Sequence, residues 1–209
     1  MAAVTRMDPR AERSDGALRA AILELAARAN VGLISVTELC RQAGISRGTF
    51  YNHAQNHGYL PTPAGLLARV LTQDLDFIRE RMERDFESRT ALGVVVRTSL
   101  ELLLDHVVSR WAVYRRGLSE DASPELLMLL VTHFEVSVRQ FMARSRRSLP
   151  GITVDSSPER RAEAENILSS AVAHSYVGVI RGWLREDTRD DLDFVLGLWF
   201  ASTPRWMLG

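Results

Sequence analysis

Apolar side chains recur three and four residues apart along most of the chain, which is the spacing of one face of an α-helix. The first such segment opens near Ser14 or Asp15 and closes at Asn30 before Gly32. No stretch alternates apolar and polar residues as a half-buried strand does, and no unit of about 20 to 50 residues repeats. The pattern therefore predicts an all-α fold.

Two short helices are expected next. One covers residues 36–43, stops at Gly44 and can be capped by Ser35 or Thr37; the other is capped by Ser46 and reaches about His53. The periodicity then fails over residues 54–61. It resumes at Thr62-Pro63, a hydroxyl cap followed by the residue type favoured at the first helical position.

The long helix that begins there has an apolar stripe, and the dense alternating charges over residues 79–89 are expected to form its solvated face. Its stripe consists of Leu66, Leu67, Val70, Leu71, Leu75, Phe77, Ile78 and Met82. Further helical patterns cover residues 92–108, 110–117, 124–147, 158 to about 184 and 192–201, with a loop over 151–157.

Composition narrows the class of protein. The 209 residues are 46% hydrophobic and 25% charged, which suits a globular chain with a sizeable core. Cys40 is the single cysteine and cannot form an internal disulfide, so a cytoplasmic location is expected. The start of the chain lacks the hydrophobic stretch of a secretory signal, and a membrane role is not expected.

Charge gives little support for strong nonspecific binding to nucleic acid. The formal net charge is zero, and all 26 fixed basic side chains are arginines. Residues 1–60 hold seven arginines and five acids, a balance of +2. Any binding to DNA must therefore depend on where a few groups are placed.

Residues 36–51 have the physical features of a helix-turn-helix. Ala43 permits close approach of two helices, Gly44 suits a left-handed turn, Ile45 can fill the space between the helices and Ser46 can cap the second one. This segment, with the stretch Ser-Arg-Gly-Thr-Phe-Tyr-Asn-His at 46–53, resembles the DNA-binding signature of the TetR (tetracycline-repressor-like) family.

The resemblance covers about residues 18–53 and implies a DNA-binding domain at 1–60 followed by a ligand-binding and dimerisation domain at 61–209. It implies that the third helix docks in the major groove of double-stranded DNA. Arg47, Gly48, Thr49 and Asn52 would point toward base edges, beside the cap Ser46. Phosphate contacts are implied for Thr37, Tyr51 and His53.

Two departures from the family pattern stand next to the motif. Ala54 occupies a position where the family usually has phenylalanine, and the lysine that usually opens the fourth helix is missing. Either the fourth helix starts at Thr62-Pro63 after a lengthened loop, or His57 replaces the lysine and the helix bends near Pro61. We favour the first register because Thr-Pro is the better helix start. Arg6, Arg10 and Arg13 could supply the missing charge, unless they form a disordered tail.

The resemblance also implies that the last two helices pair with those of a second copy. Gly178 and Gly182 form a small-residue face, and an isolated subunit is expected to expose Trp183, Trp199 and Phe200. A homodimer is therefore predicted. The effector pocket is expected among aromatic and polar residues of inner helices, namely Trp111, Tyr114, His133, Phe134, Tyr176 and Arg181.

No signature of catalysis is present. The chain lacks His-Glu-x-x-His, Gly-x-Ser-x-Gly, a phosphate-binding glycine loop and paired Glu-x-x-His motifs, and His106, His133 and His174 belong to separate helices. We expect no enzyme activity, no cofactor and no metal. The resemblance implies a ligand-responsive transcriptional regulator that acts as a repressor. The alternatives are a protein-interaction module with weakened DNA binding and a DNA binder without a ligand.

Overall fold

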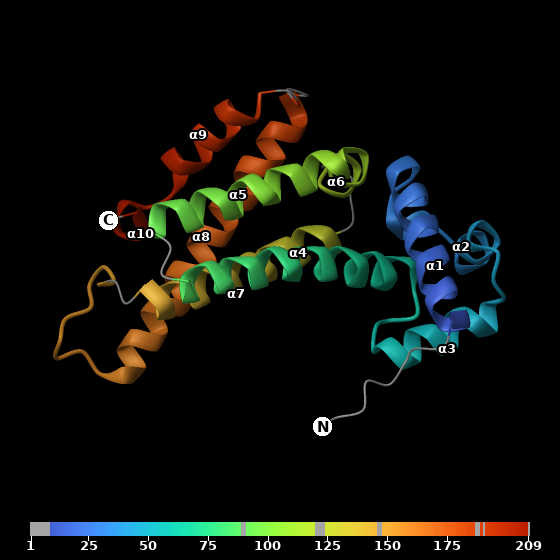
Figure 1. Ribbon diagram of the computed structural model, residues 1–209, viewed down its shortest axis with the longest axis horizontal. Helices are drawn as coiled ribbons and strands as arrows, with labels where there is room; N and C mark the ends of the chain where they lie inside the picture. Colours follow the sequence, from blue (N-terminus) through green and yellow to red (C-terminus); the bar gives the residue numbers. More distant parts are fainter. Residues whose placement is uncertain are drawn as a thin grey trace. The chain divides into compact units, whose positions relative to one another are not determined.

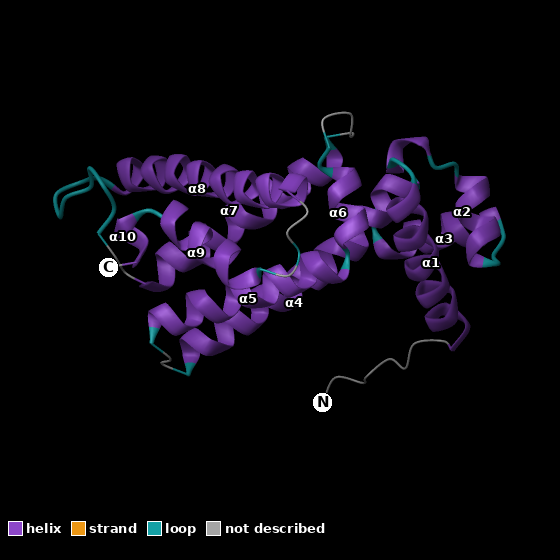
Figure 2. Ribbon diagram, turned by 90° about the horizontal axis from the view of Figure 1, so that it is seen from above, coloured by secondary structure: helices purple, strands orange, loops and turns teal. Residues whose placement is uncertain are grey.

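The computed structural model describes residues 9–88, 91–119, 124–145, 148–186, 189 and 191–208. Helices and connecting loops make up the described part of the chain, without strands (Figure 2). This confirms the all-α prediction. The chain divides into two compact units, residues 1–71 with 112–123 and residues 72–111 with 124–209. The first unit includes the start of the fourth helix.

The first unit is built on three helices, α1 (Pro9–Arg28), α2 (Val36–Ala43) and α3 (Arg47–His57). They gather in one cluster, with α2 packed against both α1 and α3 (Figure 1). A short 3₁₀ helix, η1 (Val31–Leu33), joins α1 to α2. The core of this unit includes Leu18, Ile22, Leu39 and Phe50, which are fully buried.

Local backbone chemistry explains where these helices start and stop. Ser35, rather than Thr37, caps α2 by accepting from the amide of Glu38 at 3.1 Å. Gly44 ends α2 at φ +65°, the left-handed region that glycine enters without strain. Ser46 then caps α3, its Oγ accepting from the amide of Thr49 at 3.0 Å. The predicted helix-turn-helix is thus present.

The third helix is longer than predicted. It continues through Ala54 to His57 and ends at Gly58, which has φ +66°. The predicted loop is correspondingly shorter, and His57 belongs to α3 rather than to the start of the next helix. The register that starts the fourth helix at Thr62-Pro63 is therefore the correct one.

The fourth helix, α4 (Pro63–Glu87), begins at a tight reversal of the chain. Thr62 Oγ1 accepts from the amide of Gly65 at 3.0 Å. A Cβ atom on Gly65 would lie 2.2 Å from the carbonyl oxygen of Leu60, so only glycine fits this position without movement of the backbone. Phe77, which the sequence analysis placed in the apolar stripe, is exposed.

The second unit contains the rest of α4 and α5 (Leu92–Ser109), α7 (Glu125–Ser145), α8 (Pro158–Glu186), α9 (Leu192–Ser202) and α10 (Arg205–Leu208). The helix α6 (Trp111–Gly117) falls at the division between units. In the second unit α7 runs against α8, and α9 packs on both α8 and α5. The short α10 was not expected from the sequence.

Within the described helices, α7 over Glu125–Arg144 is long and apolar enough to cross a membrane, a property that it shares with core helices of soluble proteins. Of the N-terminal arginines, Arg6 lies outside the described residues, whereas Arg10 and Arg13 belong to α1. The segment that carries these two is thus helical and is not an irregular tail.

Candidate nucleic-acid interface and ligand pocket

The helix α3 has one buried edge and one solvent-facing side. Phe50, His53 and Ala54, at helical spacing, are buried in the first unit. The remaining residues of α3 are exposed, including Arg47, Gly48, Thr49, Tyr51 and Asn52, and so are Ser46 and Thr37. Of the eight residues predicted to meet DNA, only His53 is buried.

The exposed side of α3 is chemically suited to an anion. Residues 47–57 contain no Asp or Glu, and no carboxylate in the described residues forms an ion pair with Arg47. The free amides at the start of a helix carry partial positive charge, which adds to that of Arg47. Packing does not require glycine at 48, because a Cβ there would meet only Ser46 Oγ at an ordinary 3.7 Å.

The imidazole of His53 is directed into the first unit. Its Nε2 lies 3.0 Å from Asp15 Oδ1 on α1, and its Nδ1 lies 2.8 Å from the hydroxyl of Tyr59. Burial lowers the pKa of His53 more than its hydrogen bond to Asp15 raises it. In the neutral form, Nε2–H donates to Asp15 and the Tyr59 hydroxyl donates to Nδ1. His53 therefore positions α3 from inside the unit.

Asp15 has a second partner from α4. Arg69 Nη1 donates to the same Oδ1 at 2.9 Å, and Arg69 Nη2 lies 3.1 Å from His57 Nδ1. Burial raises the pKa of Asp15, but Arg69 and His53 together outweigh that effect and leave it below its usual value. Burial also raises the pKa of Tyr59 to about 12, so Tyr59 keeps its proton. One carboxylate thus links α1, α3 and the start of α4.

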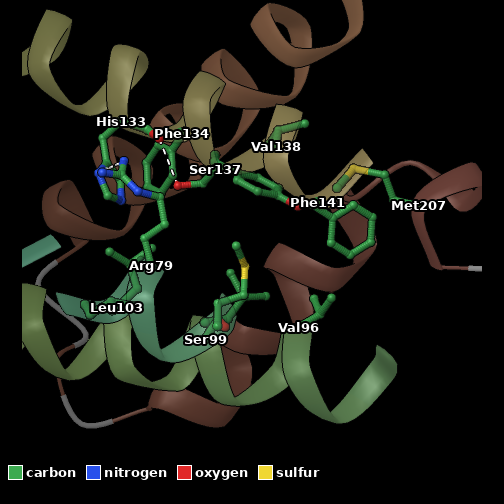
Figure 3. Close-up of a pocket in the computed structure, with 14 residues that line it drawn as sticks. Arg79, Val96, Ser99, Leu103, His133, Phe134, Ser137, Val138, Phe141 and Met207 are labelled. Carbon is green, nitrogen blue, oxygen red and sulfur yellow. Dashed lines mark hydrogen bonds between the residues drawn. The ribbon is translucent and has the colours of Figure 1, made fainter. Parts of the chain in front are cut away.

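The second unit contains a pocket of about 80 Å³. Figure 3 shows it between α4 and α5 on one side and α7 on the other, with His133 and Arg79 at one end and Phe141, Val96 and Met207 at the other. The complete lining is Ile78, Arg79, Met82, Val96, Ser99, Leu100, Leu103, His133, Phe134, Ser137, Val138, Phe141, Tyr176 and Met207. A ligand there would meet a long apolar wall and one polar end.

Arg79 and His133 form the polar end of the pocket, and Asp76 pairs with Arg79. Arg79 Nη1 lies 3.5 Å from His133 Nδ1, and Arg79 Nη2 pairs with Asp76 of the same helix. The His133 side chain is 8% exposed. Burial, followed by the positive charges of Arg79 and His106, lowers its pKa to about 4. His133 is therefore neutral near pH 7 and offers one donor and one acceptor.

The structure brings together half of the predicted pocket residues. His133, Phe134 and Tyr176 line the pocket, whereas Trp111, Tyr114 and Arg181 do not. Tyr114 is fully buried. Trp111 packs edge-on against Trp183, with ring centroids 4.9 Å apart.

Arg79 is the polar pocket residue that the sequence analysis missed. Its place at the head of an alternating charge run favoured a solvated position, yet its side chain is only 20% exposed. The aliphatic lining residues were also missed, because pocket walls and filled cores use the same residue types at the same spacing. The signal that the sequence offers is that Arg79 follows Leu75 by four residues and so lies on the same face of the helix.

The outer surface of α8 and α9 differs from the prediction. Trp183 and Trp199 are buried within the subunit, where Trp199 packs against Tyr176 at 5.3 Å between ring centroids and against Phe134 at 6.2 Å. Phe200 is only partly exposed. The exposed face is instead a row of small and apolar residues with one polar residue, His174. We call it the α8/α9 stripe: Ile167, Ala171, His174, Gly178, Gly182, Phe194, Gly197, Leu198 and Ala201.

The lowered pKa of His133 predicts a loss of stability in acid. Between the unfolded pKa of 6.5 and the folded value of about 4, the unfolded chain binds a proton that the folded chain does not, so the free energy of unfolding falls as the pH falls. The full effect is about 3 kcal/mol at most. Urea unfolding at about pH 7 and about pH 4.5 measures it.

In His133→Gln this part of the acid loss should disappear, whereas Asp155→Asn, a change in the exposed loop before α8, should behave like the unchanged protein. Equal acid losses in His133→Gln and in the unchanged protein would show that His133 does not hold a depressed pKa.

No protein-family model and no curated protein matches the chain. Solved structures do share its fold. FadR of Thermus thermophilus, a TetR-family transcriptional repressor in complex with lauroyl-CoA, has a TM-score of 0.61 at 17% identity, over 93% of each chain. NalD of Pseudomonas aeruginosa, the secondary repressor of the MexAB-OprM multidrug efflux pump, has 0.54 at 22% identity, over 93% of this chain and 98% of its own.

A third similar structure is the transcriptional regulator FadR of Bacillus subtilis in complex with stearoyl-CoA, with a TM-score of 0.56 at 14% identity, over 90% of this chain and 99% of its own. These similarities extend through both units and are not confined to the helix-turn-helix. They agree with the resemblance of residues 46–53 to the TetR signature. The chain therefore has the all-α fold of a TetR-family transcriptional repressor.

Proposed function

We propose that this chain is a ligand-responsive transcriptional repressor that binds a palindromic operator as a homodimer. The observation that carries the proposal is the exposed side of α3, which presents Arg47, Thr49 and Asn52 without an acidic residue along the helix. A helix of this kind, held by a second helix across a glycine turn, fits the major groove. The similarity in fold to repressors supports the same reading.

In the proposed complex, Arg47 reads a guanine through its two-pronged guanidinium, and Thr49 and Asn52 contact neighbouring base edges. Tyr51, which is 48% exposed, and Thr37 bind phosphates. Ser46 positions α3 through its cap, and Gly48 allows close approach of the backbone to the duplex. His53 is omitted from this surface because both of its ring nitrogens are engaged inside the unit.

The proposed dimer forms through the α8/α9 stripe. Gly178, Gly182 and Gly197 have open space where a Cβ would stand, so another helix can approach closely there. Phe194 and Leu198 add exposed apolar surface beside them. Burial of such a face against its own copy in a second subunit gives the two-fold symmetry that a palindromic operator requires.

The proposed effector occupies the pocket of the second unit. The pocket favours a molecule with an apolar chain and a polar head that accepts hydrogen bonds from Arg79 and His133. Two of the similar structures hold acyl-CoA molecules, which have such an apolar chain. Because about 80 Å³ is well below the size of common ligand clefts, about 300 to 1,000 Å³, a large effector must widen the pocket.

The helix α4 offers a route from effector to DNA. It carries Arg79 at the pocket and Arg69 at the carboxylate of Asp15. Widening of the pocket would displace α4 and change the spacing of the two α3 helices in the dimer, which must stand about 34 to 36 Å apart to enter successive major grooves. The effector then lowers operator affinity because it binds the displaced state more tightly.

Arg47→Ala should weaken binding to the operator by a factor of about 5 to 150, the equivalent of one lost arginine–guanine contact of about 1 to 3 kcal/mol. Fluorescence anisotropy with the DNA upstream of the chain's own gene measures it. Arg160→Ala removes the same charge from an exposed position on α8 and should bind normally. Absence of sequence-specific binding at moderate salt would instead favour the protein-interaction module.

Leu198→Arg should convert the dimer into a monomer, because it places a charge in the middle of the α8/α9 stripe. Light scattering at micromolar concentration measures the mass. Val154→Arg is the matched control, since Val154 is fully exposed in the loop before α8. A stable monomer in the unchanged protein would refute the dimer.

Arg79→Met should lower the affinity for dodecanoate by about tenfold, the loss expected when one charge-assisted hydrogen bond is removed. Isothermal titration calorimetry measures it. Arg97→Gln serves as control, because Arg97 pairs with Glu101 on the outside of α5 and does not line the pocket. If neither dodecanoate nor its coenzyme A thioester binds the unchanged protein, the chain is a DNA binder that uses another effector class or none.

A further inference from the structure

Three metal-binding side chains meet in the first unit, away from the proposed DNA-reading residues. His53 and His57 lie one turn apart on α3, with ring centroids 4.3 Å apart, and Asp15 approaches from α1. One nitrogen from each imidazole and one carboxylate oxygen all lie within 4.8 Å of one another. A pair of histidines four residues apart on a helix presents both rings on the same face.

A cation is already held at this place. The guanidinium of Arg69 donates through Nη1 to Asp15 Oδ1 at 2.9 Å and points Nη2 at His57 Nδ1, 3.1 Å away. The lone pair of His57 and the carboxylate of Asp15 therefore converge on one positive group. His53 Nε2, 3.0 Å from the same carboxylate oxygen, borders that position.

We propose that Asp15, His53 and His57 form a binding site for a divalent transition-metal ion of the Zn²⁺ class, which takes the place of the Arg69 guanidinium. Two imidazole nitrogens and one carboxylate oxygen are a donor set that such ions prefer, with water as the fourth ligand. Ligand bonds of about 2.0 to 2.2 Å require the three donors to draw together slightly. The exposed His57 provides the path of entry.

The surroundings of His53 suit the role of a ligand. When Nε2 binds the ion, the proton of the neutral ring moves to Nδ1, where it can be donated to the Tyr59 hydroxyl at 2.8 Å. Such a partner fixes the orientation of a metal-bound imidazole. The displaced Arg69 keeps a favourable position over the Tyr59 ring, whose centroid is 5.8 Å from its Cζ.

Ion binding and the Arg69 contacts exclude each other. With Arg69 in place, α4 is tied to both α1 and α3 through Asp15 and His57. With the ion in place, α1 and α3 are tied to each other and α4 is released from them. The site is therefore a metal-sensitive connection between α3 and α4. Metal binding at this site does not depend on the identity of the effector.

Titration of the tag-free protein with Co²⁺, followed by visible absorption and by displacement with Zn²⁺, tests the site. We expect one ion per chain, a spectrum of nitrogen and oxygen ligands without a thiolate band from Cys40, and loss of this binding in His57→Gln. Arg69→Gln should bind at least about tenfold more tightly, because the competing positive charge is gone. Asp155→Asn, which removes a carboxylate from the exposed loop before α8, should bind like the unchanged protein, and circular dichroism checks that each variant is folded.

Three results would overturn the proposal. The first is the absence of saturable Co²⁺ or Zn²⁺ binding up to millimolar concentration in both the unchanged protein and Arg69→Gln. The second is equal binding by His57→Gln and the unchanged protein. The third is no gain of affinity in Arg69→Gln. None of these results bears on operator binding, which rests on the opposite side of α3.

Discussion

The first unit depends on the buried edge of α3. Phe50, His53 and Ala54 face inward, and because a helix has 3.6 residues per turn, Arg47, Thr49 and Asn52 must then face solvent. The hydrogen bonds of His53 to Asp15 and Tyr59 fix the rotation of α3 about its own axis. A different rotation would bury the arginine and expose the phenylalanine. The side of α3 that is proposed to contact DNA is thus exposed because Phe50, His53 and Ala54 are buried on the opposite side.

The helix α4 is the second constraint, since it contributes side chains to both units. Arg69 reaches Asp15 and His57 in the first unit, while Arg79 stands at the polar end of the pocket in the second. These two arginines lie ten residues apart on α4, one on each side of the division between the units. The proposed effector response therefore depends on α4, the helix that holds both Arg69 and Arg79.

Local signals in the sequence predicted the fold well because each one has a local physical cause. Gly44 and Ser46 located the turn and the start of α3, and Thr62-Pro63 located the start of α4. The end of α3 was misplaced because Ala54 to His57 carry little apolar periodicity, and the stop is supplied by the positive φ of Gly58. The resemblance at residues 46–53 added the family's fold, which the similar structures support.

The sites were harder to predict because they depend on contacts between distant segments. Residues 15, 53 and 69 come into contact only after three helices have packed, and their spacing in the sequence does not predict this contact. Trp183 and Trp199 were expected at a subunit interface, yet Trp111, Tyr176 and Phe134 cover them within the chain. Large aromatic residues mark burial, but the sequence does not state whether the covering surface belongs to the same subunit.

The central claim is that α3 reads the major groove, and methylation interference tests it most directly. Methyl groups on guanine N7 project into the major groove and obstruct a helix that lies there. The account predicts interference at guanines in two half-sites whose centres are about 10 base pairs, or a small multiple of one turn, apart. Binding that is indifferent to N7 methylation throughout the bound DNA would contradict it.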